Sequence, residues 1–409
     1  MIDRIHTIIL KALGCALFGL EKPELNIEDV NAVIKESKLQ AVFSCIYPVL
    51  KNDFKKLMPS AEFTKLENEF LIHIANSIRV NAEHVELHRL MTEKGIPYVI
   101  LKGCASSSYY DEPFTRTMGD VDFLVYEHDV ENGIKALEGI GFKRDEYEFT
   151  TNQSAYHRGA HSVWEIHKSV TGIPSGVEGE IIKSSLSDII ETADVYEKDG
   201  LVFRCPNITN HGVVLLLHKA SHMTTSGIGL RHLCDWAVFE SKLSSDEFTE
   251  LFEDKLKRFG LWRFAQVMTL LCEKYLGAPF KQWAQVNGIK DNELEDLMLD
   301  ILSGGNFGHK DKNRQREIKY ITDREKGKIG NRNMASQVFK SLNDKVYNDY
   351  KFIKKHKVLL PIGWVIETFA YAKLIVQGKR KSEGTVAMLK EASKRKEIYN
   401  KLHLFEVDC

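Results

Sequence analysis

The chain contains 409 residues, 43% of them hydrophobic, and its formal net charge is −1. This length and apolar content are sufficient for two or three domains with a substantial core, and they exclude an intrinsically disordered chain. The near-neutral charge gives no general attraction to nucleic acid. Seven scattered cysteines, without a C-x-x-C pair, indicate reduced thiols in a cytoplasmic protein that has no structural zinc.

Residues 1–96 are predicted to form an N-terminal helical region. Charged residues precede and interrupt the apolar patch at 8–20, which favours an amphipathic first helix over a signal peptide. Helical periodicity also covers 26–51 and 60–93, and Gly95 is placed to end the last of these runs.

Residues 97–206 are predicted to form an α/β core that begins with a buried strand at 98–101. This strand continues through Lys102 and Gly103 into small residues that can begin a helix. Free backbone N–H groups and the positive end of the helix dipole attract anions, so the turn is a natural cradle for phosphate. Ser106 is expected either to donate to phosphate oxygens or to cap the helix.

Two aspartates, Asp120 and Asp122, open the next apolar strand. Alternate side chains of a strand point to the same face, so the two carboxylates project together. They repel each other unless a cation lies between them, and hard oxygen ligands of this kind suit Mg²⁺ or Mn²⁺. The alternative is a solvated strand end without metal. Together, the cradle and the carboxylate pair favour a nucleoside triphosphate as ligand.

A third acid lies on a later predicted strand, 162–167. Alternation places Glu165 and His167 on one face and Trp164 and Ile166 on the other. Glu165 is therefore expected to face a cleft, and the alternative is that both polar side chains lie on a solvated sheet face.

The order of these features resembles the DNA polymerase β-type nucleotidyltransferase superfamily. More narrowly, it is similar to a large, poorly characterised bacterial nucleotidyltransferase family, over a region that extends to about residue 280. The motifs that carry this resemblance are Leu101-Lys102-Gly103, Arg116-x-x-x-Asp120-x-Asp122 and Glu165-Ile166-His167. The chain departs from the superfamily at the turn, which usually reads Gly-Gly or Gly-Ser and here reads Lys102-Gly103-Cys104.

The resemblance implies an α+β fold, in which a polymerase β-type nucleotidyltransferase core of a small mixed sheet with helices is flanked by N-terminal and C-terminal helical regions. It implies that Asp120, Asp122 and Glu165 bind the catalytic metal, and that Glu165 can accept the proton of the attacking hydroxyl. The expected phosphate contacts are Lys102, the N–H groups of Gly103 and Cys104, and Arg116, unless Arg116 instead braces the aspartate loop.

Residues 207–303 are predicted to form a helical region that packs on the core. His218 and His222 share a helix face, as do Arg231 and Asp235 on the next helix. The histidines fit ordinary helical residues or a zinc site, although the His-Asp doublet of helical phosphohydrolases is missing from this sequence. The resemblance implies a third interpretation, in which His218 and Arg231 touch the nucleotide and Asp235 orients Arg231.

Residues 304–409 are predicted to form a mostly helical basic region, after a glycine-rich boundary at 303–308. Lys and Arg outnumber the acids in 309–332 and 373–401. Such runs indicate solvated basic faces, or a surface for RNA or another acidic partner. The apolar stretch 358–376 contains charged residues, so it is expected to be a buried helix or a partner surface rather than a membrane span.

The predicted function is metal-dependent nucleotidyl transfer, in which a nucleoside monophosphate moves from a nucleoside triphosphate to a hydroxyl acceptor and pyrophosphate is released. Mg²⁺ or Mn²⁺ is the expected cofactor, and ATP is among the candidate nucleotides. A small molecule, a protein hydroxyl and a tRNA 3′ end remain open as acceptors. The alternative is a catalytically inactive nucleotide-binding protein that acts by interaction or regulation.

Overall fold

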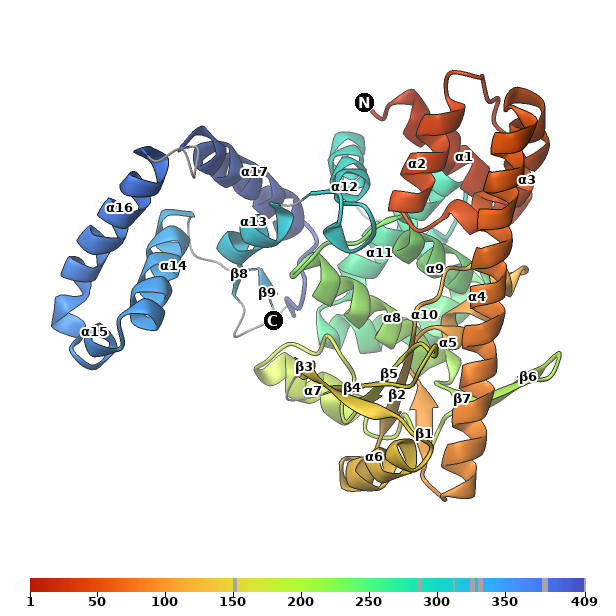
Figure 1. Ribbon diagram of the computed structural model, residues 1–409, viewed down its shortest axis with the longest axis horizontal. Helices are drawn as coiled ribbons and strands as arrows, with labels where there is room; N and C mark the ends of the chain where they lie inside the picture. Colours follow the sequence, from red (N-terminus) through yellow and green to blue (C-terminus); the bar gives the residue numbers. More distant parts are fainter. Residues whose placement is uncertain are drawn as a thin grey trace.

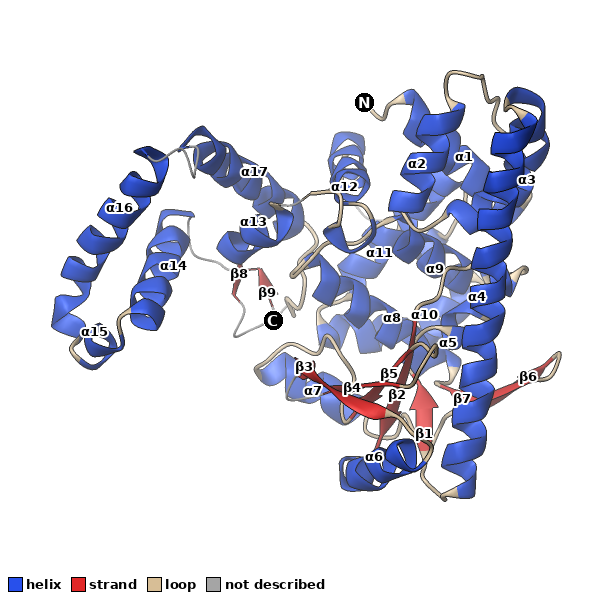
Figure 2. Ribbon diagram, in the orientation of Figure 1, coloured by secondary structure: helices blue, strands red, loops and turns tan. Residues whose placement is uncertain are grey.

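The computed structural model describes residues 1–149, 153–285, 288–311, 313–323, 328–329, 334–376 and 382–407. Figure 1 shows a small sheet beside a large body of helices, with C-terminal helices that project from this body as an arm. Most strands lie together in the lower part of the view in Figure 2, and one short pair lies apart from them, beside the C-terminal helices. The predicted α+β class, with a small mixed sheet flanked by helices, is confirmed.

The N-terminal region is helical, as predicted. Its helices are α1 (Arg4–Phe18), α2 (Val30–Leu39), α3 (Phe43–Leu57) and α4 (Ser60–Glu93). The periodic run at 26–51 is divided between α2 and α3 at Ala41, whose φ of 55° is left-handed. The long helix α4 has the bounds expected from the sequence. Gly95 follows it with a φ of 65°, a conformation that suits glycine after a helix end.

The five-stranded sheet has the order β1-β2-β5-β4-β3. Its strands are β1 (Tyr98–Ile100), β2 (Asp120–Val125), β3 (Lys143–Phe149), β4 (Gln153–His157) and β5 (Val163–His167). Strands β2 and β5 are parallel, and the other neighbouring pairs are antiparallel. Alternate residues of these two strands, such as Phe123 and Trp164, are buried with apolar side chains of α4 and of α6 (Val130–Gly139). The intervening residues therefore face the other side of the sheet.

Short elements connect the sheet to the helical half. They are α5 (Cys104–Ser107), the 3₁₀ turn η1 (Pro113–Thr115), α7 (Val177–Ser185) and the hairpin β6 (Asp194–Lys198) with β7 (Leu201–Cys205). Helix α4 packs against β7 and β2, so it forms one wall of the sheet domain.

The helical half begins at residue 208. Its helices are α8 (Ile208–Met223), α9 (Leu230–Ser241), α10 (Ser245–Phe259), α11 (Trp262–Leu271), continued by a π turn (Cys272–Leu276), and α12 (Asp291–Gly304). Their buried apolar side chains form one cluster with those of α1, α2 and α3. The first and third predicted parts of the chain thus share a core, while the division into parts 1–96, 97–206, 207–303 and 304–409 remains a prediction.

The C-terminal region is mostly helical. Its helices are α13 (Arg314–Ile321), α14 (Met334–Asp349), α15 (Lys351–Lys355), α16 (Leu360–Val376) and α17 (Ser382–Asn400), with a short pair of strands β8 (Thr322–Asp323) and β9 (Lys328–Ile329). Helix α17 is tied to α12 and α13 by the buried carboxylate of Asp300, which pairs with Arg314 and Arg395. Residues 312, 324–327, 330–332 and 377–381 of the two basic runs lie outside the described residues.

The apolar helix α16 lies in the projecting arm with α14 and α15 (Figure 1). Ile362, Val365 and Phe369 are exposed, so the expectation of a buried helix is wrong for these side chains. The expectation of a partner surface stays a prediction. Among the described residues, every helix is too short or too polar to cross a bilayer.

Candidate functional site

A cavity of about 340 Å³ lies between the sheet and helices α8 and α9. The predicted site residues that line it are Lys102, Gly103, Ser106, Arg116, Asp120, Asp122, Glu165, His218 and Arg231. Cys104 is different, because its buried thiol faces α4 and donates to Oδ1 of Asn81 over 2.9 Å. The structure thus brings together the two sets of residues, one from the sheet and one from the helices, that the sequence placed far apart.

The parallel pairing of β2 and β5 brings two of the carboxylates together. Asp122 is the direct neighbour of Glu165 across the two strands, and Leu124 is the neighbour of His167. Because alternate side chains share a face, Asp120, Asp122, Glu165 and His167 all lie on the side of the sheet opposite the apolar core. The period-2 pattern read from the sequence is confirmed here.

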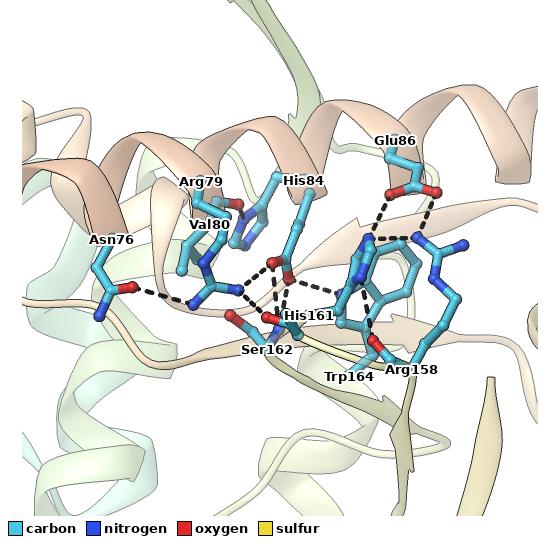
Figure 3. A network of polar contacts seen from close by, with 11 residues as sticks. Asn76, Arg79, Val80, His84, Glu86, Arg158, His161, Ser162 and Trp164 are labelled. Atoms are coloured by element: carbon cyan, nitrogen blue, oxygen red, sulfur yellow. Dashed lines mark hydrogen bonds and ion pairs between the residues drawn. The ribbon is translucent and has the colours of Figure 1, made fainter.

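A polar network holds the chain that leads into β5 against helix α4 (Figure 3). The carboxylate of Glu83 accepts hydrogen bonds from the Ser162 N–H at 3.0 Å and from the indole N–H of Trp164 at 3.1 Å. A second contact joins Arg158 to Glu86 over 2.7 Å. Both ends of this segment are therefore tied to a rigid helix, which fixes where β5 presents Glu165.

Asp122 is the most enclosed of the three acids and is already neutralised by the protein. One carboxylate oxygen lies 3.0 Å from Nζ of Lys102, and the other lies 3.0 Å from Nε2 of His167. Burial alone would raise the pKa of Asp122, but these two partners outweigh it and lower that pKa below the usual range. Burial opposes the charged form of Lys102 and of His167 too, yet the acids raise the pKa of each.

Asp120 and Glu165 carry charge that the protein compensates less completely. Among the described residues, Asp120 forms no ion pair, and the nearby charge of Asp122 raises the pKa of Asp120. Oε2 of Glu165 accepts a hydrogen bond from Gln153 at 3.0 Å and lies 3.4 Å from His167. This repulsion among acids, with hard oxygen donors facing one cavity, fits a divalent cation such as Mg²⁺ or Mn²⁺.

The tightest set of ligand atoms differs from the predicted one. Atoms of Asp122, Glu165 and His167 lie within 4.8 Å of one another, whereas Asp120 lines the same cavity outside that group. His167 therefore joins the candidate ligands, although an imidazole is a weaker ligand than a carboxylate for Mg²⁺.

Arg116 forms a buried ion pair rather than an open phosphate contact. Its Nε and Nη2 donate to the two carboxylate oxygens of Asp235 at 2.7 and 2.8 Å, and the hydroxyl of Tyr110 donates to the same carboxylate at 2.8 Å. Of the two roles predicted for Arg116, this geometry favours the brace. The expected pairing of Asp235 with Arg231 is wrong, because among the described residues no ion pair joins the two and Asp235 pairs with Arg116 instead.

The turn before α5 has the glycine geometry that the sequence indicated. Gly103 has a φ of 62°, and a Cβ atom there would lie 3.2 Å from Nε2 of the buried His84. The side chain of Ser106 is buried, and its hydroxyl has no partner within the described part of the chain. The hydroxyl of Ser107 donates instead to the Cys104 carbonyl at 3.0 Å.

The helical wall contains residues that the sequence prediction named and others that it missed. Arg231 donates from Nη1 to the Thr117 carbonyl at 3.1 Å, and its guanidinium lies 5.1 Å from the ring centre of Phe307. His222, which the sequence prediction paired with His218, also lines the cavity, and the residues that it missed are Gln153, Lys219, His232 and Phe307. No local sequence pattern identifies Lys219 as a cavity residue. It follows a buried apolar run, where an ordinary solvent-exposed lysine of a helix could also stand.

With this geometry established, comparison with known proteins identifies the family. A family described as "Uncharacterised nucleotidyltransferase" matches residues 26–277, which is more than half of the chain. The chain belongs to this nucleotidyltransferase family. The match covers the sheet, the predicted acids and helices α8 and α9, and it ends before α12 and Phe307. No curated protein matches the sequence.

Proposed function

We propose that the protein transfers a nucleoside monophosphate from a nucleoside triphosphate to a hydroxyl acceptor and releases pyrophosphate. The observation that carries this proposal is the placement of Asp122 beside Glu165 on parallel strands, with Asp120 on the same face of the sheet. Family membership supports a nucleotidyl transfer role in general. The metal, the roles of the residues and the release of pyrophosphate are our proposals.

Asp120, Asp122 and Glu165 are assigned to a Mg²⁺ or Mn²⁺ site. When bound, the metal supplies positive charge that stabilises the transferring phosphoryl group. Glu165 is assigned the role of the base that accepts the proton of the acceptor hydroxyl. The hydrogen bond from Gln153 orients this carboxylate through Oε2 and leaves Oε1 for the acceptor.

The phosphate contacts are assigned to the turn and to the two walls of the cavity. Lys102 supplies positive charge beside the acids, and the N–H groups of Gly103 and Cys104 with the Ser106 hydroxyl offer hydrogen bonds. Arg231 and His218 reach the nucleotide from the helical wall. Arg116 acts on the site indirectly, since its pairing with Asp235 holds the loop before β2 against α9.

A second candidate is a nucleotide-binding protein without transfer activity. One observation favours it: both carboxylate oxygens of Asp122 are engaged by Lys102 and His167, so a cation must compete with them. In either case the cysteine pattern supports a cytoplasmic protein, and the described cysteines are free thiols.

Binding and transfer assays separate the two candidates. ATP, GTP, CTP and UTP are titrated with and without Mg²⁺, and label transfer from the bound nucleotide to small molecules, to the protein itself and to tRNA is followed. Mg²⁺-dependent binding with transfer supports the enzyme, and binding without transfer to any acceptor supports the second candidate. Absence of nucleotide binding contradicts both.

A further inference from the structure

The helical wall of the cavity presents hydrogen-bond donors without acceptors. Nε of Arg231 and Nε2 of His232 are both buried, and neither has a partner among the described residues. Lys219 adds an ammonium that is only 1% exposed. All three residues line the cavity opposite the carboxylates.

The hydrogen bonding of His232 identifies its free nitrogen as a donor. The Gly229 N–H donates to Nδ1 of His232 at 3.2 Å, so the ring proton of the neutral imidazole must lie on Nε2. The ring is neutral because burial, followed by the charge of Arg231, lowers the pKa of His232 well below its usual value. This arrangement leaves Nε2 with a proton to donate and no lone pair for a metal, which argues against a zinc site built from His218, His222 and Nε2 of His232.

Lys219 is a buried cation whose charge is stabilised by few neighbouring polar or acidic groups. Its Nζ makes one long hydrogen bond, 3.3 Å, to the Leu215 carbonyl of its own helix, and it lies 5.5 Å from the ring centre of Trp236. No carboxylate of the described residues is within ion-pair distance. Burial lowers the pKa of Lys219 to about 8, which still leaves most of the amine charged at neutral pH. An unpaired buried charge is costly, and an anionic ligand would remove that cost.

The ion pairs of the cavity leave its two walls with opposite charge. Lys102 is matched by Asp122, and Arg116 is matched by Asp235. Among the described residues that line the cavity, Lys219 and Arg231 on the helical wall are the cations without a carboxylate partner. Among the same residues, the acid without a cationic partner is Asp120 on the sheet wall.

We propose that Lys219, Arg231 and His232 form an oxyanion-binding subsite that takes a phosphate-like group. The subsite needs no metal, since its donors and charges belong to the protein. It deepens the proposed function and rests on it only for the identity of the molecule that carries the anion. That molecule is either the nucleoside triphosphate, through its phosphate tail, or an acceptor with a phosphate or carboxylate group.

Calorimetric titration of the full-length protein with inorganic pyrophosphate in EDTA tests the subsite. The wild type is expected to bind, and Lys219→Met and Arg231→Met are each expected to weaken binding by about 10- to 100-fold, the loss of a hydrogen bond to a charged group. His232→Phe is expected to weaken it less, because that donor is neutral. Lys242→Met is the matched control, since Lys242 is exposed at the C-terminal end of α9 and pairs with Asp111 outside the cavity.

Lys219→Met is expected to fold, so a loss of pyrophosphate binding in this variant would not reflect unfolding. Lys219→Met removes an unpaired buried charge and keeps a side chain of similar length, so the melting temperature is expected to stay or rise. Absence of pyrophosphate binding by the wild type overturns the proposal, as does equal binding by the wild type, Lys219→Met and Arg231→Met.

Two further arms separate the subsite from the proposed function and identify its ligand. Asp120→Asn with Asp122→Asn is expected to abolish transfer and to retain pyrophosphate binding in EDTA, because the carboxylates are not part of the subsite. Competition between pyrophosphate and a non-hydrolysable triphosphate assigns the subsite to the phosphate tail. Simultaneous binding assigns it to the acceptor. Pyrophosphate binding by a wild type that transfers no nucleotide would leave the subsite standing and the transfer proposal refuted.

Discussion

Arg116 offers a sharp test, because its two predicted roles give different results when both members of its ion pair are removed. Arg116→Met leaves the Asp235 carboxylate buried, with Tyr110 as its remaining donor. Removal of one partner from a buried pair costs about 3–5 kcal/mol. The double variant Arg116→Met with Asp235→Leu removes both charges, and such replacements are often close to neutral, so it should recover most of that loss.

The free energy of unfolding is expected to change with pH in opposite directions in the wild type and in Arg116→Met. Burial would raise the pKa of Asp235, but Arg116 outweighs it and lowers this pKa from 3.8 to about 2. A carboxyl with a lowered folded-state pKa contributes stability that is present above its unfolded pKa and is lost as the pH falls. The wild type should therefore lose about 2 kcal/mol from this group between about pH 4 and pH 2. Without Arg116, burial raises the pKa of Asp235, so Arg116→Met should instead become less unstable as the pH falls from 7 towards 4.

Urea denaturation of the wild type and of the single and double variants measures these differences. Titration of the double variant with a non-hydrolysable triphosphate then decides the role of Arg116. A brace predicts a stable double variant that still binds the triphosphate. A loss below about 1 kcal/mol in Arg116→Met, the size typical of an exposed pair, would refute the brace. A stable double variant that no longer binds the triphosphate would show that Arg116 contacts phosphate.

Three other variants test the sheet side of the cavity. Glu165→Gln should lower kcat by roughly two to four orders of magnitude, with a smaller effect on triphosphate affinity, and steady-state kinetics that show lost affinity with normal kcat would remove Glu165 from the chemistry. Gly103→Ala should destabilise the protein by about 1–2 kcal/mol in urea denaturation, because its φ is 62° and its Cβ would lie 3.2 Å from His84. Gly119→Ala, with open space around its Cβ, is the control. Equal stability of the two variants would show that a side chain at position 103 causes no strain. Lys102→Met leaves Asp122 with only His167 as a cationic partner, so Mg²⁺ should raise the melting temperature of this variant more than that of the wild type. An equal shift in both proteins would show that Lys102 does not take the place of the metal in neutralising Asp122.

The sequence predicted those features that depend on local periodicity. The alternation along β2 and β5 identified Asp120, Asp122 and Glu165, and the helical run at 60–93 gave the bounds of α4. These predictions succeeded because an alternating strand or an amphipathic helix fixes which side chains share a face. The Lys102-Gly103 turn was found for a similar reason, since glycine is the residue that tolerates its left-handed φ.

The partners of the charged residues could not be predicted, because they depend on how distant segments pack. Arg116 and Asp235 are 119 residues apart, and the helical spacing of Arg231 and Asp235 pointed to a pairing that the packing does not form. Lys219 resembles a solvated helix residue in the sequence and becomes a cavity cation only when α8 faces the sheet. Phe307 reaches the cavity from beyond the segment that matches the family.

In the proposed function, Asp120 and Asp122 hold a metal for nucleotidyl transfer. The direct measurement is transfer of label from nucleoside triphosphates that carry ³²P at the α-phosphate, compared for the wild type and for Asp120→Asn with Asp122→Asn. We predict labelled product with the wild type in Mg²⁺ or Mn²⁺, none in EDTA, and none with a folded double variant. Unchanged turnover by the double variant would contradict the role of these two aspartates in binding the metal.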